Sequence, residues 1–196
     1  MGGKVNLARL ALLAGVLTIS GCGFIRPVDL GESTHTMQEL CDFPKPFFAK
    51  QFNATNLKTS SVTSTPMSKK IGLGESCFYE TPTEYLGYVA LRQEPKQSAV
   101  EGRLARHISV DGASVDQYVD PIPTNRNHRT TQPSYTLTAT IDGWYGELHY
   151  NLGNDAGTQA GAETLQAGAE TLVGMVRALK GQPLPSKARR IFGWPW

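Results

Sequence analysis

The chain has 196 residues, of which 40% are hydrophobic and 18% are charged, so it can bury one hydrophobic core but is too short for a multidomain machine. No apolar run approaches the roughly 20 residues of a membrane-spanning helix, which excludes a polytopic membrane protein. The formal net charge is only +2, so nucleic acid is not an expected partner.

The first 21 residues have the layout of a secretory signal peptide. Lys4 and Arg9 supply positive charge without an acidic residue, and an apolar run follows from Leu10 to Ile19. As a helix this run would be about 15 Å long, half of the roughly 30 Å hydrocarbon core, so it cannot anchor the protein by itself. Its removal takes Lys4 and Arg9 from the 19 basic residues and leaves 17 against 17 acidic ones, a neutral mature chain.

The apolar run ends in the sequence LTISGC, residues 17–22. This motif resembles the lipobox of bacterial lipoproteins, in which small residues precede an obligatory cysteine. The resemblance implies that Cys22 receives a diacylglycerol thioether and becomes the first residue of the mature chain. Two acyl chains anchor a protein far more firmly than one, at about 0.8 kcal/mol per buried methylene. The alternative is a plain secretory signal with an incidental cysteine, and Ile19 in place of the commoner leucine supports it.

The two remaining cysteines, Cys41 and Cys77, form an even pair in a chain addressed to an oxidising exterior. This pattern predicts a disulfide. A metal site is the alternative, but it needs further ligands at short spacing. The four histidines are scattered without such a pattern: His35, His107, His128 and His149. We therefore expect no metal ion and no cofactor.

Four segments are expected along the chain: the signal peptide over residues 1–21, a tether over 22–36, a domain over 37–182 and a basic-aromatic tail over 183–196. The tether has few large apolar residues. At the start of the domain, phenylalanines recur at near-helical spacing, but Pro44 and Pro46 interrupt them. Two short helical pieces around Cys41 are therefore predicted.

The next part of the domain has a β pattern. Residues 59–66 are rich in serine and threonine and are expected to form a loop or an edge strand. A strand begins near Cys77, a turn follows at residues 81–83, and the second strand covers Tyr85 to Leu91. This second strand carries apolar residues on both faces, which favours a central position in the sheet.

Residues 96–107 place apolar side chains on one helical face and end in Arg106 and His107, which suit the end of a helix. We therefore predict a helix there, followed by a turn at Asp111 and Gly112. Residues 118–133 hold three prolines and several basic residues, and they are expected to form an exposed loop.

A β-hairpin is predicted over residues 135–152. The pair Asp142-Gly143 separates two runs of alternating apolar residues, which is the strongest short-range hairpin signal. Leu137 and Ile141 share one face of the first strand, while Trp144 and Leu148 share a face of the second.

The last predicted helix begins near Asn154 or Asp155 and ends before Gly181. AGAETL occurs twice in it, with a period of seven, and a stripe of apolar residues steps by three and four. A coiled coil is the alternative, but two of the six seam residues are alanines and the helix is short. A helix packed on a sheet is the better interpretation. The stripe consists of Ala162, Leu165, Ala169, Leu172, Val176 and Leu179.

The order of these features resembles the small secreted lipoproteins of high-GC Gram-positive bacteria, in particular the family catalogued as DUF3558. The resemblance rests on the signal and lipobox, the helical segment around Cys41, the residues ESCFY at 75–79 where a strand begins, and the C-terminal helix. It implies an α+β domain on the outer face of the membrane. From the elements above we expect an antiparallel sheet packed by the C-terminal helix and by short N-terminal helical segments. The family supplies no catalytic residue to carry over.

The motifs of serine hydrolases, zinc proteases, nucleotide-binding loops and dinucleotide-binding folds are absent from the sequence. The most catalytic-looking group is Asp142, Glu147 and His149 at the hairpin. Glu147 and His149 share one face of a strand, and a general base needs an orienting carboxylate nearby. No nucleophile lies at a predictable distance, and the polar face of a strand explains the same pattern, so we expect no enzyme.

The C-terminal tail combines cations with aromatic residues. After Glu170 there are five basic side chains and no acidic one, which suits a membrane interface or an anionic lipid headgroup. The alternative is that the aromatic residues fold back onto the domain. The residues expected to contact a membrane or a partner are Arg189, Arg190, Phe192, Trp194 and Trp196.

These observations predict a cell-membrane lipoprotein, anchored by lipid and facing outward, that acts as a non-enzymatic binding or interaction module. The expected partners are the membrane, reached through the lipid on Cys22, and another envelope protein or a lipid-like ligand. Two alternatives stay open: a membrane-active or phage-exclusion lipoprotein, and an envelope hydrolase that uses Glu147 and His149.

Overall fold

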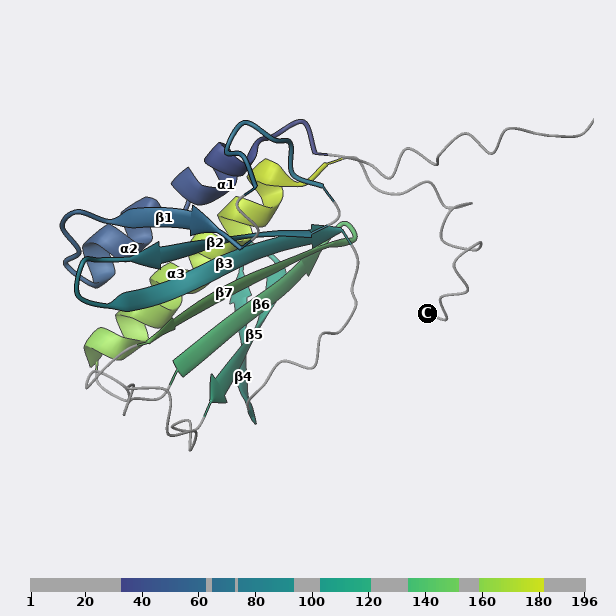
Figure 1. The fold of residues 1–196 in the computed structure, drawn as a ribbon. Coiled ribbons are helices and arrows are strands. Elements are labelled where there is room, and N and C mark those ends of the chain that lie inside the picture. Colours follow the sequence, from purple (N-terminus) through teal and green to yellow (C-terminus); the bar gives the residue numbers. More distant parts are fainter. Residues whose placement is uncertain are drawn as a thin grey trace, which may run out of the picture.

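A computed structural model describes residues 33–62, 65–72, 74–93, 103–120, 134–151 and 159–181 of the chain. Within these residues one antiparallel sheet is packed by helices on a single face (Figure 1). The predicted α+β fold is therefore confirmed. The helices are α1 (Met37–Asp42), α2 (Lys45–Gln51) and α3 (Gln159–Leu179). The strands are β1 (Lys58–Ser61), β2 (Gly74–Glu80), β3 (Tyr85–Gln93), β4 (Arg103–Val110), β5 (Ala113–Asp120), β6 (Ser134–Ile141) and β7 (Trp144–Asn151).

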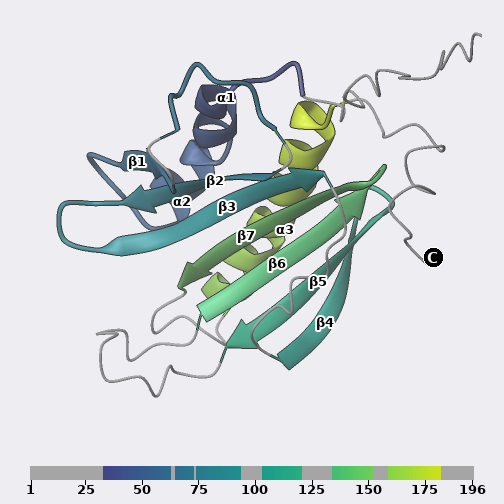
Figure 2. The same ribbon diagram turned by 45° about the vertical axis from the view of Figure 1, so that its right-hand side comes forward.

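The described strands follow the order β1-β2-β3-β7-β6-β5-β4 across the sheet. The hairpin β6–β7 thus lies in the middle, between β3 and β5, and β1 and β4 are the two edges (Figure 2). Residues 59–66, expected to form a loop or an edge strand, contain the edge strand β1 as far as Ser61. The predicted interior position of β3 is confirmed. Asp142 and Gly143 have positive φ angles of 52° and 82°, which a two-residue turn between such strands requires.

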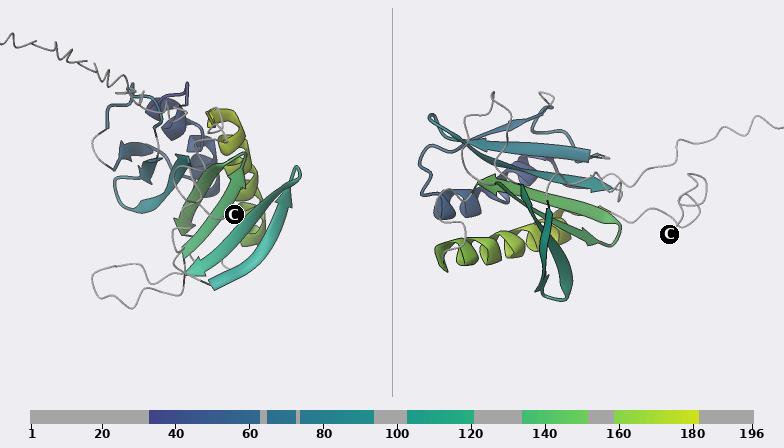
Figure 3. Two further views of the ribbon diagram at one scale, coloured as in Figure 1. Left: turned by 90° about the vertical axis from the view of Figure 1, so that its right-hand side faces the viewer. Right: turned by 90° about the horizontal axis from the view of Figure 1, so that it is seen from below.

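Helix α3 lies along the sheet as predicted, and its apolar stripe forms the centre of the core (Figure 3). Five of the six predicted stripe residues are buried, while Ala162 is exposed. Opposite them the sheet contributes buried side chains that include Trp144 and Leu148, and α2 adds Phe47 and Phe48. Burial of this one face by an amphipathic helix fits the packing interpretation rather than a coiled coil.

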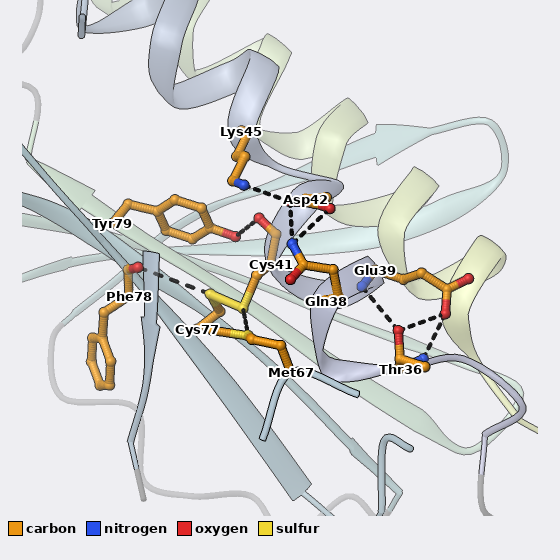
Figure 4. A network of polar contacts seen from close by, with 10 residues as sticks. All are labelled: Thr36, Gln38, Glu39, Cys41, Asp42, Lys45, Met67, Cys77, Phe78 and Tyr79. Carbon is orange, nitrogen blue, oxygen red and sulfur yellow. Dashed lines mark hydrogen bonds and ion pairs between the residues drawn. A yellow bond between two sulfur atoms is a disulfide. The ribbon is translucent and has the colours of Figure 1, made fainter. Parts of the chain in front are cut away.

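The two short helices around Cys41 are also confirmed. Thr36 and Glu39 form a capping box at the start of α1, with the Thr36 N–H donating to Glu39 Oε2 over 2.6 Å (Figure 4). The hydrogen bond between His35 and Glu39, together with those from Thr36, lowers the pKa of Glu39 to about 2. Pro44 is the residue before α2, and Pro46 lies in its first turn, where a backbone N–H has no helical acceptor.

The predicted disulfide joins Cys41 of α1 to Cys77 of β2, with the two Cα atoms 5.4 Å apart (Figure 4). Next to it, the buried Tyr79 hydroxyl donates to the Cys41 carbonyl over 2.9 Å. The bond closes a loop between residues 36 positions apart, for which the loop-entropy relation gives about 4 kcal/mol of stability. It ties the first helix of the domain to the sheet.

One predicted element is wrong, and another begins later than predicted. In place of the helix predicted over residues 96–107, the structure has strand β4 from Arg103 onward. This strand pairs with β5, and its register shifts between Leu104 and Arg106. The loop predicted over 118–133 is strand as far as Asp120. Residues 94–102 and 121–133 lie outside the described part.

Ordered contacts begin before the expected domain boundary at residue 37. Ser33 is buried, its hydroxyl donates to the Leu179 carbonyl over 2.7 Å, and its N–H donates to the Ile71 carbonyl over 3.1 Å. The last four residues of the expected tether thus belong to the fold.

Candidate functional site

The strand register aligns one residue from each strand in a row on the face of the sheet opposite the helices. Three members of this row are ring-bearing neighbours: Phe78, Tyr88 and His149. The Phe78 and Tyr88 ring centroids are 5.8 Å apart, and the Tyr88 and His149 rings are stacked at 5.0 Å. The row thus forms a band of rings and hydroxyls running perpendicular to the strands. Its complete sequence is Ser60, Phe78, Tyr88, His149, Thr136, Tyr118 and Leu104.

Glu147 is the central charged group of this outer face, in the row next to the ring band. Its residue is 6% exposed, although it lies on a sheet face that no described helix covers. Tyr88 donates a hydrogen bond to one carboxylate oxygen, and Tyr145 donates to the other over 3.5 Å. The Arg92 guanidinium lies 3.9 Å from the second oxygen. Hydroxyl donors and a nearby cation therefore hold this buried carboxylate in place.

The two tyrosines are affected by the same surroundings. Burial raises the pKa of Tyr88, and the hydrogen bond to Glu147 and its negative charge raise that pKa further. Burial and the same carboxylate raise the pKa of Tyr145. Both hydroxyls therefore remain protonated at physiological pH and act as donors.

His149 has a different set of partners. Its Nδ1 lies 3.0 Å from the Thr136 hydroxyl oxygen, and its ring stacks on Tyr88 with an angle of 15° between the planes. Burial lowers the pKa of His149 to about 4, so the imidazole is neutral at pH 7. A neutral ring on a tyrosine platform offers a flat surface and one polar edge, without a charge.

The structure separates the three residues of the catalytic-looking group. Asp142 lies in the β6–β7 turn and forms an ion pair with Lys180 at the end of α3, which lowers the pKa of its carboxyl group. Glu147 and His149 share the outer face as predicted, but the hydrogen bonds of each go to other residues. Glu147 therefore does not orient the imidazole of His149. A catalytic relay between the two residues would require that orientation.

Local sequence patterns did not indicate that the predicted pair has as its neighbours Tyr88, Arg92, Tyr145 and Thr136. Alternation placed Tyr88 on one face of its strand, but no local signal indicated that this strand pairs with β7, since Tyr88 and Glu147 are 59 residues apart. Cys22 and the tail residues from Lys187 to Trp196 lie outside the described part of the chain.

Within the described residues, no group of three or more His, Cys, Asp or Glu side chains is arranged to hold a metal ion. No described helix combines the length and hydrophobicity that crossing a membrane demands. Comparisons with known proteins find no match to the chain among family models, curated proteins or solved structures.

Proposed function

We propose that this protein is a lipid-anchored lipoprotein of the cell envelope, whose domain works outside the cytoplasmic membrane as a non-enzymatic binding or interaction module. The observation that best supports this proposal is the pairing of the cysteines. The chain has three, and the disulfide between Cys41 and Cys77 uses two of them inside the fold. The remaining one is Cys22, at the end of the lipobox-like motif. A disulfide also fits an extracytoplasmic address.

The outer face supports a binding role better than a catalytic one. It combines stacked rings with a carboxylate, a guanidinium and hydroxyls in a fixed arrangement, and such a mixture of apolar and polar groups suits recognition. A hydroxyl does lie beside His149, since Thr136 Oγ1 is 3.0 Å from its Nδ1, but Thr136 is buried and no described hydrogen bond joins Glu147 to the imidazole. Another envelope protein or a lipid-like molecule is the proposed partner.

The proposed lipid anchoring is tested by expressing the full chain and its Cys22→Ala variant in a bacterium that processes lipoproteins. Intact mass and detergent-phase partitioning are the measurements. We expect the wild-type chain to begin at Cys22, carry added lipid mass and enter the detergent phase, because the apolar run is too short to anchor it. The Cys22→Ala variant should be unprocessed or remain in the aqueous phase.

A Ser20→Ala variant is the matched control, since it keeps a small residue before the cysteine and should behave as wild type. A wild-type chain without added lipid mass would refute the proposed anchoring.

A membrane-active role for the tail is the second candidate, and one contact favours it. The hydrogen bond from Ser33 to the Leu179 carbonyl brings the first and last parts of the described fold together. Ser33, which Cys22 precedes in the sequence, and Leu179, which the tail follows, therefore lie at the same end of the domain. A lipid on Cys22 would hold this end toward the bilayer.

A further inference from the structure

Strand β4 is an edge of the described sheet, so the backbone groups on its outer side have no strand partner there (Figure 2). Edge strands of this kind are templates onto which an extended peptide can add as a further strand. With eight residues, β4 is twice as long as the other edge strand, β1.

A cavity of about 360 Å³ lies between β4 and α3. Four consecutive residues of β4, Arg106 to Ser109, line it. Because successive side chains of a strand point to opposite faces, a cavity bordered by all four lies against the edge of the strand rather than against one face. A ligand in it would therefore meet the unpaired backbone of β4.

Helix α3 forms the opposite wall with Ala162, Leu165 and Gln166. The buried Leu165 of α3 and Ile108 of β4 give the cavity an apolar interior. Ala162 and Gln166 are exposed at its rim. The apolar stripe of α3 thus extends past the core into the cavity, which explains why Ala162 is exposed although it follows the stripe.

Arg106 gives the cavity a positive charge. Its Nε donates to the buried Gln117 side-chain oxygen over 2.7 Å, which fixes the guanidinium. None of the ion pairs among the described residues includes Arg106, whereas the neighbouring His107 pairs with Asp116 at 2.6 Å. A fixed guanidinium without a described acidic partner is complementary to a carboxylate.

We propose that the cavity between β4 and α3 binds an extended peptide segment that adds to the edge of β4 and places a carboxylate on Arg106 and an apolar side chain against Ile108 and Leu165. The backbone of β4 supplies main-chain hydrogen bonds, and the cavity supplies specificity. The carboxylate is either a chain terminus or an acidic side chain. This inference deepens the proposed interaction role, but it does not depend on the lipid at Cys22.

Three acetylated peptides separate the two sources of the carboxylate: TVTVTL with a free C-terminus, the same peptide as an amide, and the amide TVTVTE. The protein is the chain from Gly23 onward, which keeps every described residue. Binding is followed by the backbone NMR signals of β4 and α3 during titration. We expect at least one carboxylate peptide to shift the signals of residues 106–109 and 162–166 and to bind at least about tenfold more tightly than the neutral amide.

Two variants locate the interaction. Arg106→Gln should abolish the preference for a carboxylate, while Arg177→Gln, which removes a cation of α3 that pairs with Asp111, should keep it. Ala162→Trp places a large side chain at the exposed rim and should block all binding. Melting temperatures establish that each variant is folded.

Equal affinity for the amide and the carboxylate peptides would overturn the proposal, as would equal losses in Arg106→Gln and Arg177→Gln. Absence of shifts at β4 with millimolar peptide would also overturn it. None of these outcomes bears on the Cys22 test, so the two proposals fail separately.

Discussion

Glu147 illustrates how a single buried charge is accommodated on a sheet face. An ionised carboxylate loses much of its hydration at 6% exposure, which is costly unless hydrogen bonds and a counter-charge replace the water. Tyr88 and Tyr145 supply the donors, and Arg92 supplies the charge at 3.9 Å. These partners come from two neighbouring strands, so the carboxylate and the ring band are fixed together.

His149 is expected to make the stability of the domain depend on pH. Its pKa is about 4 in the fold and 6.5 in a model peptide, so below pH 6.5 the unfolded chain binds more protons than the folded one. The free energy of unfolding should therefore fall as the pH drops from about 6.5 to about 4, by about 1 kcal/mol per pH unit at the steepest. Denaturant unfolding at pH 7.5, 6.5 and 5.5 measures this slope.

Replacement by a side chain that does not titrate separates this effect from the other histidines. His149→Gln should flatten the slope between pH 7.5 and 5.5, whereas His107→Gln, at an exposed position, serves as the matched control and should keep it. An unchanged slope in His149→Gln would show that the imidazole titrates normally in the fold.

Local sequence signals predict the helices and strands correctly where a turn or a proline fixes the chain. Asp142-Gly143 determined the hairpin, and Pro44 and Pro46 separated α1 from α2. The signal failed at β4, where Leu104 and Arg106 are separated by a register shift that disrupts strict alternation. Alternation is the sign of a strand, so its loss left a spacing that resembles a helix.

The neighbours of Glu147 and His149 in the candidate site could not be predicted from local sequence patterns. Glu147 and His149 were found because they are two residues apart on one strand. Tyr88 and Arg92 become their neighbours only because β3 pairs with β7, across a large sequence separation. Cavity-lining residues such as Arg106 and Leu165 depend in the same way on where α3 crosses the sheet.

The contact between β7 and α3 depends on Gly146. A Cβ atom at this position would lie 2.2 Å from Val176 Cγ2 and 2.9 Å from Leu172 Cδ1, so the helix would have to move. We expect Gly146→Ala to lower the free energy of unfolding by about 1–3 kcal/mol, as overpacking of a core does. Denaturant unfolding monitored by circular dichroism measures the change.

Gly74→Ala is the matched control, because its Cβ would meet the flexible Arg92 side chain at ordinary contact distances, with Cγ nearest at 3.4 Å. A Gly146→Ala variant no less stable than Gly74→Ala would contradict the close approach of α3 to β7.

At the scale of the whole molecule, the two ends of the described fold are fastened close to one another. Ser33 bonds to the end of α3, and the disulfide ties α1 to β2. A force applied at residue 33 would therefore reach the sheet through the disulfide and α3 through a buried hydrogen bond. Such an arrangement suits a domain that is held at one point of its chain.

The same closeness leads to a prediction about the tail. Lys187, Arg189 and Arg190 would each add about 1 kcal/mol of attraction near an anionic bilayer, and the tryptophans would add apolar burial. An anchor at Cys22 would raise the effective concentration of the tail at the surface, so modest affinity would be sufficient. We expect the chain from Gly23 to bind vesicles that contain phosphatidylglycerol, and to lose this binding when residues 185–196 are deleted.

Vesicle co-sedimentation and thermal unfolding, measured on the same two proteins, decide between the two interpretations of the tail. Salt should weaken binding to the anionic vesicles, because it screens the attraction between exposed charges, and vesicles of phosphatidylcholine alone should bind less. The deletion leaves every described residue in place, so the melting temperature should not change if the tail contacts the bilayer. A large fall in melting temperature, with no vesicle binding by either protein, would instead identify the tail as part of the core.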